Sequence, residues 1–298
     1  MTYNNNTKFL ELDKEVDASD STKTWNTKLS LHSTYGKCEP VKSPMVHDGC
    51  QPKLLNHIRF VCISDTHGKH RKINLPDGDV LLHAGDITNV GETNQLEDFA
   101  EWLSDLPFKQ KIVIAGNHDL SIDRAYYSNR ENYAHILGNK KSDADPELIT
   151  NRARKALCSP SKNKFTYLED ESETVLGGYK IYGSPWQPEF YNWAFNLSRG
   201  EECSKMWNKI PLDTDILLTH GPPVGHGDKC RSGHNAGCVD LLARVVDHVK
   251  PIFHIFGHIH EGYGATTNGT TTFVNPSTCT LSYKPDNPPL VFDLPIRE

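Results

Sequence analysis

The sequence has no long hydrophobic run. Across its 298 residues, no apolar stretch approaches the roughly 18 residues that a membrane-spanning helix requires. Residues 1–16 are polar and carry charges of both signs, unlike the apolar segment of a secretory signal. The eight cysteines form no Cys-x-x-Cys pair, which favours reduced and buried thiols. From these absences we expect a cytoplasmic protein without a membrane partner.

An excess of basic residues is also missing. The chain has 32 lysines and arginines against 38 aspartates and glutamates, which gives a formal net charge of −6. Because proteins that bind long nucleic acid usually present a clustered basic face, we expect no such partner. The hydrophobic share of 37% is ordinary for a globular protein, and the length permits a sizeable core. The oligomeric state stays open.

Composition divides the chain into two parts. Residues 1–56 are rich in Asn, Thr, Lys, Asp and Ser and show little periodicity, so we expect a mostly irregular N-terminal extension. Residues 57–298 contain short apolar runs that alternate with polar segments, as expected for one folded domain.

Five of these apolar runs end at a polar loop whose side chains can bind metals. The runs are 58–63, 79–83, 111–114, 215–218 and 251–256. Their length suits strands that are buried on both faces, and helix candidates lie between them at 93–103 and 239–249. Alternating strands and helices predict a layered α/β fold, in which sites gather at the carboxyl ends of the strands.

Further β-prone runs predict a second sheet. These runs are 178–183, 270–275, 279–283 and 290–294. Because turns separate the short runs of the C-terminal third, we expect mainly antiparallel strands that pack on the first sheet.

The loops after the five apolar runs carry seven candidate metal ligands. They are Asp65, His67, Asp86, Asn117, His220, His258 and His260. Alternate side chains of an extended chain point the same way, so Asp65 and His67 can meet one ion. Oxygen and nitrogen ligands without thiolate suit Mn, Fe, Zn, Mg or Co rather than a soft metal. A single Asp-x-His pair carries little weight, but five motifs in this order predict a metal centre.

A carboxylate can bridge two ions through its two oxygens. If Asp86 does so, the seven side chains give each of two ions four contacts, and the formal charge of about +2 attracts phosphate. Such a centre lowers the pKa of bound water, so we expect phosphoester hydrolysis by a metal-activated hydroxide. Asp86 and Asn117 are the predicted catalytic ligands, and His118 is assigned to the leaving group or to transition-state charge.

Taken together, the motifs resemble the signature of the calcineurin-like metallophosphoesterases. They read Ser-Asp-Thr-His at 64–67, Gly-Asp at 85–86, Gly-Asn-His-Asp at 116–119, Thr-His-Gly at 219–221 and Gly-His-Ile-His at 257–260. Longer stretches at 60–67, 193–197, 257–264 and 287–289 are similar to the animal metallophosphoesterase-domain-containing proteins, a brain-expressed group akin to class III cyclic-nucleotide phosphodiesterases. The resemblance makes residues 57–298 a metallophosphoesterase domain.

The resemblance implies a four-layer αββα sandwich of two mixed sheets around a two-metal site. By it, one ion is held by Asp65, His67, Asp86 and His260, and the other by Asp86, Asn117, His220 and His258. Some members of the group carry glycine at the position of His258, whereas this chain keeps the histidine and with it a complete centre.

The function that the resemblance implies is hydrolysis of small phosphodiesters, cyclic nucleotides above all, with manganese as the first choice of metal. Three alternatives stay open: a phosphomonoesterase or nucleotidase, an exonuclease, and a nucleotide-binding scaffold with little catalysis. The aromatic residues of the segment 186–195 also have two interpretations, because they can line a substrate cleft or pack in the core.

Overall fold

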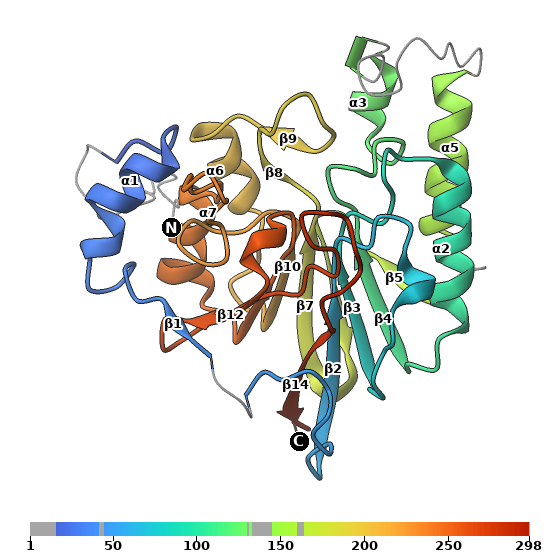
Figure 1. Ribbon diagram of the computed structural model, residues 1–298, viewed down its shortest axis with the longest axis horizontal. Helices are drawn as coiled ribbons and strands as arrows, with labels where there is room; N and C mark the ends of the chain where they lie inside the picture. The colour runs from blue at the N-terminus through green and yellow to red at the C-terminus, as the bar shows by residue number, and fades with distance from the viewer. Residues whose placement is uncertain (1–15, 42–44, 130, 133–144, 160–163, 298) are drawn as a thin grey trace, which may run out of the picture.

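Two β-sheets face each other, and helices cover their outer faces (Figure 1). The computed structural model describes residues 16–41, 45–129, 131–132, 145–159 and 164–297. The helix–sheet–sheet–helix order confirms the four-layer α/β sandwich expected from the sequence. Both sheets contain parallel and antiparallel neighbours, so both are mixed.

The five-stranded sheet has the order β14-β2-β3-β4-β5. Its strands are β2 (His57–Ile63), β3 (Val80–Ala84), β4 (Gln110–Ile114), β5 (Thr166–Tyr167) and β14 (Leu290–Pro295). Alternate residues of β2 point to opposite faces: Phe60 packs between the sheets, and Val61 packs against the helical layer. That layer contains α2 (Thr93–Asp105) and α5 (Pro146–Leu157).

The seven-stranded sheet has the order β1-β12-β13-β11-β10-β7-β6. Its strands are β1 (Glu39–Pro40), β6 (Glu171–Val175), β7 (Tyr179–Ser184), β10 (Ile216–Thr219), β11 (Phe253–Ile255), β12 (Gly264–Thr267) and β13 (Thr272–Asn275). On its outer face, Tyr182 and Leu217 pack against α6 (Glu201–Trp207) and α7 (Val239–Ala243). A π-helical segment, η4 (Arg244–Val249), continues α7, so the helix expected over 239–249 is present.

The remaining elements are short. They are α1 (Ser21–Thr27), α3 (Arg124–Ser128), β8 (Gln187–Pro188), β9 (Asn196–Leu197) and the 3₁₀ turns η1 (Leu29–Leu31), η2 (His70–Lys72), η3 (Leu176–Gly178) and η5 (His260–Gly262). Among the described residues, no helix combines the length and the apolar character that a membrane crossing requires. All eight cysteines are free.

The second sheet differs from the antiparallel sheet expected from the C-terminal runs. β14, from the run 290–294, pairs with β2 in the other sheet, and the three central pairs of the seven-stranded sheet are parallel. The run 279–283 forms a turn and no strand. Both sheets turn apolar side chains inward, so the pattern of a short run does not tell which sheet it joins.

Part of the N-terminal extension forms regular structure and packs on the rest of the fold. Of its described residues, 21–27 form α1, and β1 pairs with β12 at the sheet edge. Leu29 is fully buried and lies in one cluster with Val239 and Leu242 of α7. The few apolar residues of this part cover the outer side of α7, and the expectation for residues 1–15 and 42–44 lies outside the described residues.

Candidate metal centre

The metal-capable loops converge at the carboxyl ends of strands from both sheets. β2, β3 and β4 of one sheet lead to Asp65, Asp86 and Asn117, and β10 and β11 of the other lead to His220 and His258. Parallel strands end at the same edge of their sheet, so the fold brings residues far apart in sequence into one centre. All seven predicted ligands meet there.

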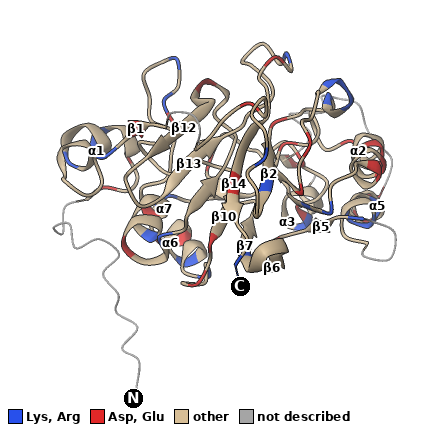
Figure 2. Cartoon of the chain, turned by 90° about the horizontal axis from the view of Figure 1, so that it is seen from below, with Lys and Arg blue, Asp and Glu red and all other residues tan. Residues whose placement is uncertain are grey.

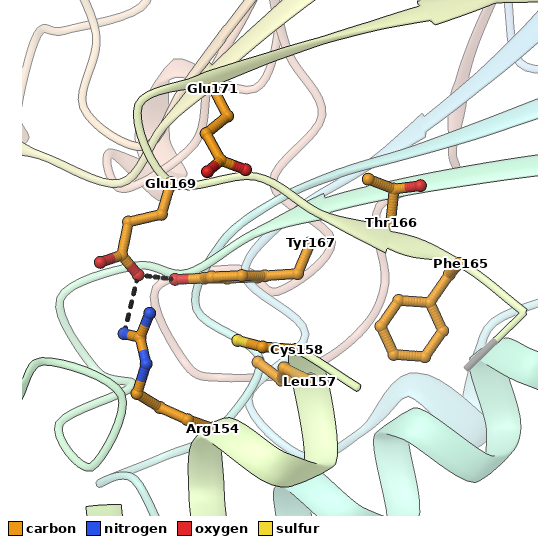
Figure 3. A pocket seen from close by; sticks show the side chains of 8 residues that line it. All are labelled: Arg154, Leu157, Cys158, Phe165, Thr166, Tyr167, Glu169 and Glu171. Carbon is orange, nitrogen blue, oxygen red and sulfur yellow. Dashed lines mark hydrogen bonds and ion pairs between the residues drawn. The ribbon is translucent and has the colours of Figure 1, made fainter. Parts of the chain in front are cut away.

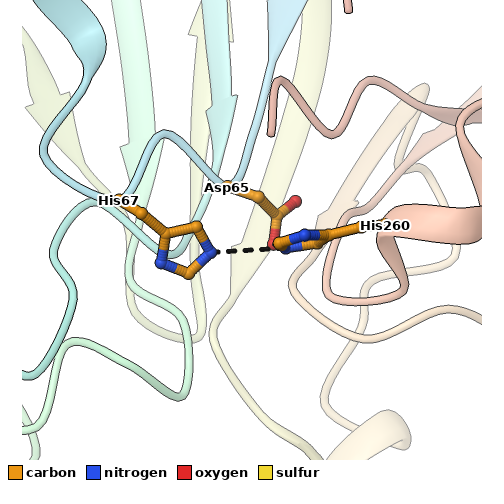
Figure 4. Close-up of side chains that lie close together, drawn as sticks. All are labelled: Asp65, His67 and His260. Atoms are coloured by element: carbon orange, nitrogen blue, oxygen red, sulfur yellow. Dashed lines mark hydrogen bonds and ion pairs between the residues drawn. The ribbon is translucent and has the colours of Figure 1, made fainter. Parts of the chain in front are cut away.

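The first ligand group consists of Asp65, His67 and His260, whose side chains point toward one another (Figure 4). His67 Nε2 lies 3.3 Å from His260 Nε2, and His260 Nε2 lies 3.4 Å from Asp65 Oδ1. Two imidazole nitrogens and a carboxylate oxygen at these separations surround a single point, as ligands of one small cation do.

The second ligand group consists of Asp86, Asn117, His220 and His258. Asn117 Oδ1 lies 2.9 Å from His220 Nε2 and 2.8 Å from His258 Nδ1. His220 Nε2 lies 3.3 Å from Asp86 Oδ1. These atoms again enclose one point, and the donor set of oxygen and imidazole nitrogen fits a divalent cation.

Asp86 stands between the two groups. Its Oδ1 faces His220, and its Oδ2 lies 3.7 Å from His67 Nε2 in the first group. Each oxygen of one carboxylate therefore faces a different ligand group, which is the arrangement a bridging ligand needs.

Backbone carbonyls fix the orientation of three of the histidines. In each case Nδ1 lies against a carbonyl oxygen, which can only accept, so Nδ1 carries a hydrogen and Nε2 points into the centre. The pairs are His67 with Thr88 at 3.1 Å, His220 with Ala84 at 2.9 Å and His260 with Thr280 at 3.2 Å.

The centre attracts positive charge. Burial opposes ionisation of Asp65, yet its hydrogen bond from His260 and the charge of that ring hold the pKa of Asp65 well below its usual value. Burial also opposes protonation of His220, but the charge of Asp86 raises the pKa of His220 to about 9. By contrast, burial lowers the pKa of His258 to about 3. The two buried carboxylates thus favour protonation of neighbouring imidazoles. Divalent cations would take the place of those protons.

His118 lies at the rim of the centre. Its backbone N–H donates to Asp86 Oδ1 at 2.8 Å, and its Nδ1 lies 2.6 Å from the carbonyl oxygen of Asn89. Its Nε2 therefore faces inward, 4.0 Å from Asp86 Oδ2. The ring is partly exposed and lies 4.1 Å from the Trp193 ring between centroids, tilted by 34° against it. This position beside the centre suits a group that meets substrate.

The local backbone is strained where the ligands are held. Asp65, His67, Asp86 and His258 have φ values of +51°, +42°, +56° and +68°, a region unfavourable for residues other than glycine. Glycine is required beside them: a Cβ on Gly116 would lie 2.6 Å from the His220 ring and closer still to Asp86. Compact loops of this kind bring backbone and ligands together in a small volume.

Asp119 ties together the loops that follow β3 and β4. It is fully buried and accepts hydrogen bonds from the backbone N–H groups of Ile87, Thr88 and Gly116 at 3.2, 2.9 and 2.9 Å. Burial and the nearby Asp86 charge raise the pKa of Asp119 to about 6. Its oxygens are occupied by these donors, and Asp119 is not among the seven predicted ligands.

The aromatic residues of the segment 186–195 divide between the core and the rim of the metal centre. Phe195 is buried and packs edge-on against Trp186 at 5.4 Å, so these two belong to the core. Phe190 is exposed and lies perpendicular to His258 at 5.2 Å, and Trp193 contacts His118. Two of the five aromatic rings therefore border the metal centre.

Sequence reasoning missed three residues at the centre. Ser277 Oγ donates to Asp65 Oδ2 at 2.7 Å, and the buried His83 bonds Thr66 at 3.1 Å and accepts the Gly85 N–H at 3.2 Å. Tyr283 lies 4.8 Å from His67. A lone serine or tyrosine gives no usable signal. The position of His83, three residues before Asp86 on a buried strand, could have indicated a supporting role.

A separate polar recess of about 420 Å³ lies beside α5 and β5, and none of its lining residues belongs to the metal centre (Figure 3). Glu169 there accepts from Arg154 at 3.0 Å and from Tyr167 at 2.7 Å. Carboxylate, guanidinium and phenol satisfy one another, so we regard this network as structural.

Comparison with known proteins agrees with the geometry. Residues 58–262 match the family of calcineurin-like phosphoesterases, and the chain belongs to that family. It is a metal-dependent phosphoesterase of the hydrolase class, and its family uses divalent metal ions.

Relatives match over most of the chain. Human metallophosphoesterase domain-containing protein 1 is 46% identical over 253 residues, which cover 85% of this chain and 75% of that protein. The Caenorhabditis elegans UPF0046 protein T07D4.2 is 41% identical over 87% of this chain and 65% of its own length. One solved crystal structure aligns with a TM-score of 0.50 at 15% identity, over 74% of this chain and 91% of that one, a likeness of fold alone.

Proposed function

We propose that this protein is a two-metal phosphodiesterase that hydrolyses small phosphodiesters, including cyclic nucleotides. The observation that carries the proposal is the position of Asp86, whose two oxygens face two separate ligand groups. Two ions that share one carboxylate would lie close enough to act on a single phosphoryl group, as in other two-metal hydrolases.

The seven side chains divide into two sets of four. Asp65, His67, Asp86 and His260 would hold one ion, and Asp86, Asn117, His220 and His258 the other. No thiolate is among them, which disfavours a soft metal. Manganese is our first choice because the family resemblance implies it, and Fe, Zn, Mg and Co are alternatives. Two divalent ions supply Lewis acidity at the phosphoryl group and hydroxide at near-neutral pH.

The protein side chains then have separate tasks. Asp86 and Asn117 would hold the ions in place. The carboxylates of Asp65 and Asp86 against two divalent ions leave a net charge of about +2, which attracts an anionic ester. His118 Nε2 faces the same space from the rim, where it can stabilise transition-state charge or protonate the leaving oxygen.

Two observations favour a small substrate. The exposed ring of Phe190 beside His258 offers an apolar contact to one organic group rather than to a polymer. Basic and acidic residues of the described chain are interspersed along the ribbon in Figure 2, and the net charge of −6 does not favour a broad basic face. Long nucleic acid would require such a face.

Hydrolysis of bis-p-nitrophenyl phosphate by the manganese-loaded protein tests the proposal. We expect turnover that Asp86→Ala and Asn117→Ala each reduce by at least about 100-fold, because each variant removes a ligand that positions the reacting groups. Cyclic nucleotides should be cleaved faster than p-nitrophenyl phosphate, a monoester. Faster cleavage of the monoester would instead support a phosphomonoesterase. If the protein binds metal but cleaves none of these substrates, the scaffold alternative would be supported.

A further inference from the structure

Tyr283 presents an exposed aromatic ring to the metal centre. Its ring centroid lies 4.8 Å from that of His67, 5.6 Å from that of His260 and 6.4 Å from that of His118. The side chain nevertheless remains 42% exposed. The ring therefore borders the space above the first ligand group and faces solvent with much of its surface.

The turn that carries Tyr283 also supplies the carbonyl oxygen that orients His260, a predicted ligand. The Tyr283 N–H donates to the carbonyl oxygen of Thr280 at 2.8 Å, and the Thr280 N–H donates to Lys284 O at 2.8 Å. The same Thr280 oxygen lies 3.2 Å from Nδ1 of His260. The position of the ring is thus coupled to the orientation of His260.

The backbone at Tyr283 is unfavourable for a tyrosine. Its φ of +55° lies in the left-handed region, which suits glycine or asparagine in a turn. An exposed ring returns little of this cost through burial, since it is not part of the hydrophobic core. Strain without a gain in packing is typical of positions that meet a ligand.

Lys69 stabilises the ring in this position. Its Nζ donates to the carbonyl oxygen of His67 at 3.1 Å and lies 5.7 Å from the centroid of the Tyr283 ring. A lysine at this distance attracts the electron-rich ring. The ammonium thus connects the turn of Tyr283 to the loop of His67, which keeps the ring beside the centre.

We propose that Tyr283 is a specificity-determining residue whose ring contacts the planar organic group of the ester, a nucleobase or an aryl group, while the metal centre holds the phosphoryl group. Lys69 is its positioning residue. This inference rests on the proposed phosphoesterase function. It assigns recognition of the planar part of the ester to the side of the first ligand group, and leaves Phe190, beside His258 of the second group, to contact another part of the ester.

The test compares two substrates with the same reacting ester. Adenosine 2′,3′-cyclic phosphate has a base, and the 2,3-cyclic phosphate of methyl riboside has none. Tyr283→Ala should raise KM for the adenosine compound about 10-fold, the scale of a base–aromatic contact, and change KM for the riboside less than about twofold. Tyr283→Phe should resemble the wild type with both. Equal losses on both substrates, or a phenylalanine variant that behaves like alanine, would overturn the proposal.

Leu281→Ala is the matched control, because Leu281 is exposed in the same turn. It should leave both KM values unchanged, which separates loss of the ring from disturbance of the turn. If the wild type cleaves neither compound and does not turn over bis-p-nitrophenyl phosphate, the proposed function fails. The subsite is then judged by calorimetry on the manganese-loaded protein, where Tyr283→Ala should weaken AMP binding about 10-fold and leave ribose 5-phosphate unchanged. If Tyr283→Ala weakened binding of AMP and of ribose 5-phosphate equally, the proposed subsite would be refuted.

Discussion

Replacement of Gly116 by alanine tests how tightly the metal centre is packed. The new Cβ would lie 2.6 Å from the His220 ring and closer to Asp86, whereas ordinary contact begins at 3.4 Å. The ligands would have to retreat by about 1 Å, while metal–ligand distances tolerate only about 0.2 Å. Misplacement on this scale costs about 100-fold in rate. The added methyl group should also lower the free energy of unfolding by about 1–3 kcal/mol.

The assay for Gly116→Ala measures metal content and kcat/KM on bis-p-nitrophenyl phosphate. We expect kcat/KM to fall about 100-fold and the ion held by His220 to be weakened. Gly269→Ala is the control. A Cβ added at Gly269, whose φ is +92°, would meet no atom within 4 Å outside its chain neighbours, so this variant should cost about 1–2 kcal/mol of stability without touching the centre. If Gly116→Ala retained full metal content and wild-type kcat/KM, close packing of Gly116 against the ligands would be refuted.

Three further predictions concern stability. Leu29→Ala should lower the free energy of unfolding by about 2–5 kcal/mol in urea titration, because Leu29 is fully buried; a loss below about 1 kcal/mol would contradict packing of the N-terminal segment. Asp119→Ala leaves three backbone N–H groups without an acceptor and should cost about 3 kcal/mol or more, whereas Asp213→Asn at an exposed carboxylate should cost less than about 0.5 kcal/mol. Burial lowers the pKa of His254 from 6.5 to about 3. Between pH 6.5 and 3, His254 is therefore protonated in the unfolded chain but not in the folded protein. As the pH falls through this window, the free energy of unfolding should decrease by about 1.4 kcal/mol per pH unit. His254→Asn should make the urea-derived stability less steep between pH 4 and 6, and parallel curves would speak against a buried neutral His254.

The centre was predictable because its ligands follow strand ends. Asp65, Asp86 and His220 each come directly after a buried apolar run, and the carboxyl ends of such strands meet at one edge in any layered α/β fold. The sequence did not show which strands belong to which of the two sheets. β14 joins β2 by backbone pairing, and its apolar residues would have fitted the inner face of either sheet.

The groups that orient the ligands gave no signal in the sequence. His220 and His260 are held by the carbonyl oxygens of Ala84 and Thr280, and every residue type offers a carbonyl. Only the three-dimensional path of the backbone decides which of them lies beside a ring. Tyr283 escaped notice for a related reason: its β-prone neighbourhood indicated a strand, whereas hydrogen bonds within 280–284 close a turn.

Calorimetric titration of the metal-free protein with manganese tests the central claim, which is a pair of metal positions joined by Asp86. We expect two ions per chain in the wild type. Asp65→Ala should weaken one of them, and Asp86→Ala should weaken both, because its two oxygens face the two ligand groups. A wild-type stoichiometry of one ion or fewer, or an Asp86→Ala variant in which one ion binds as in the wild type, would contradict the claim.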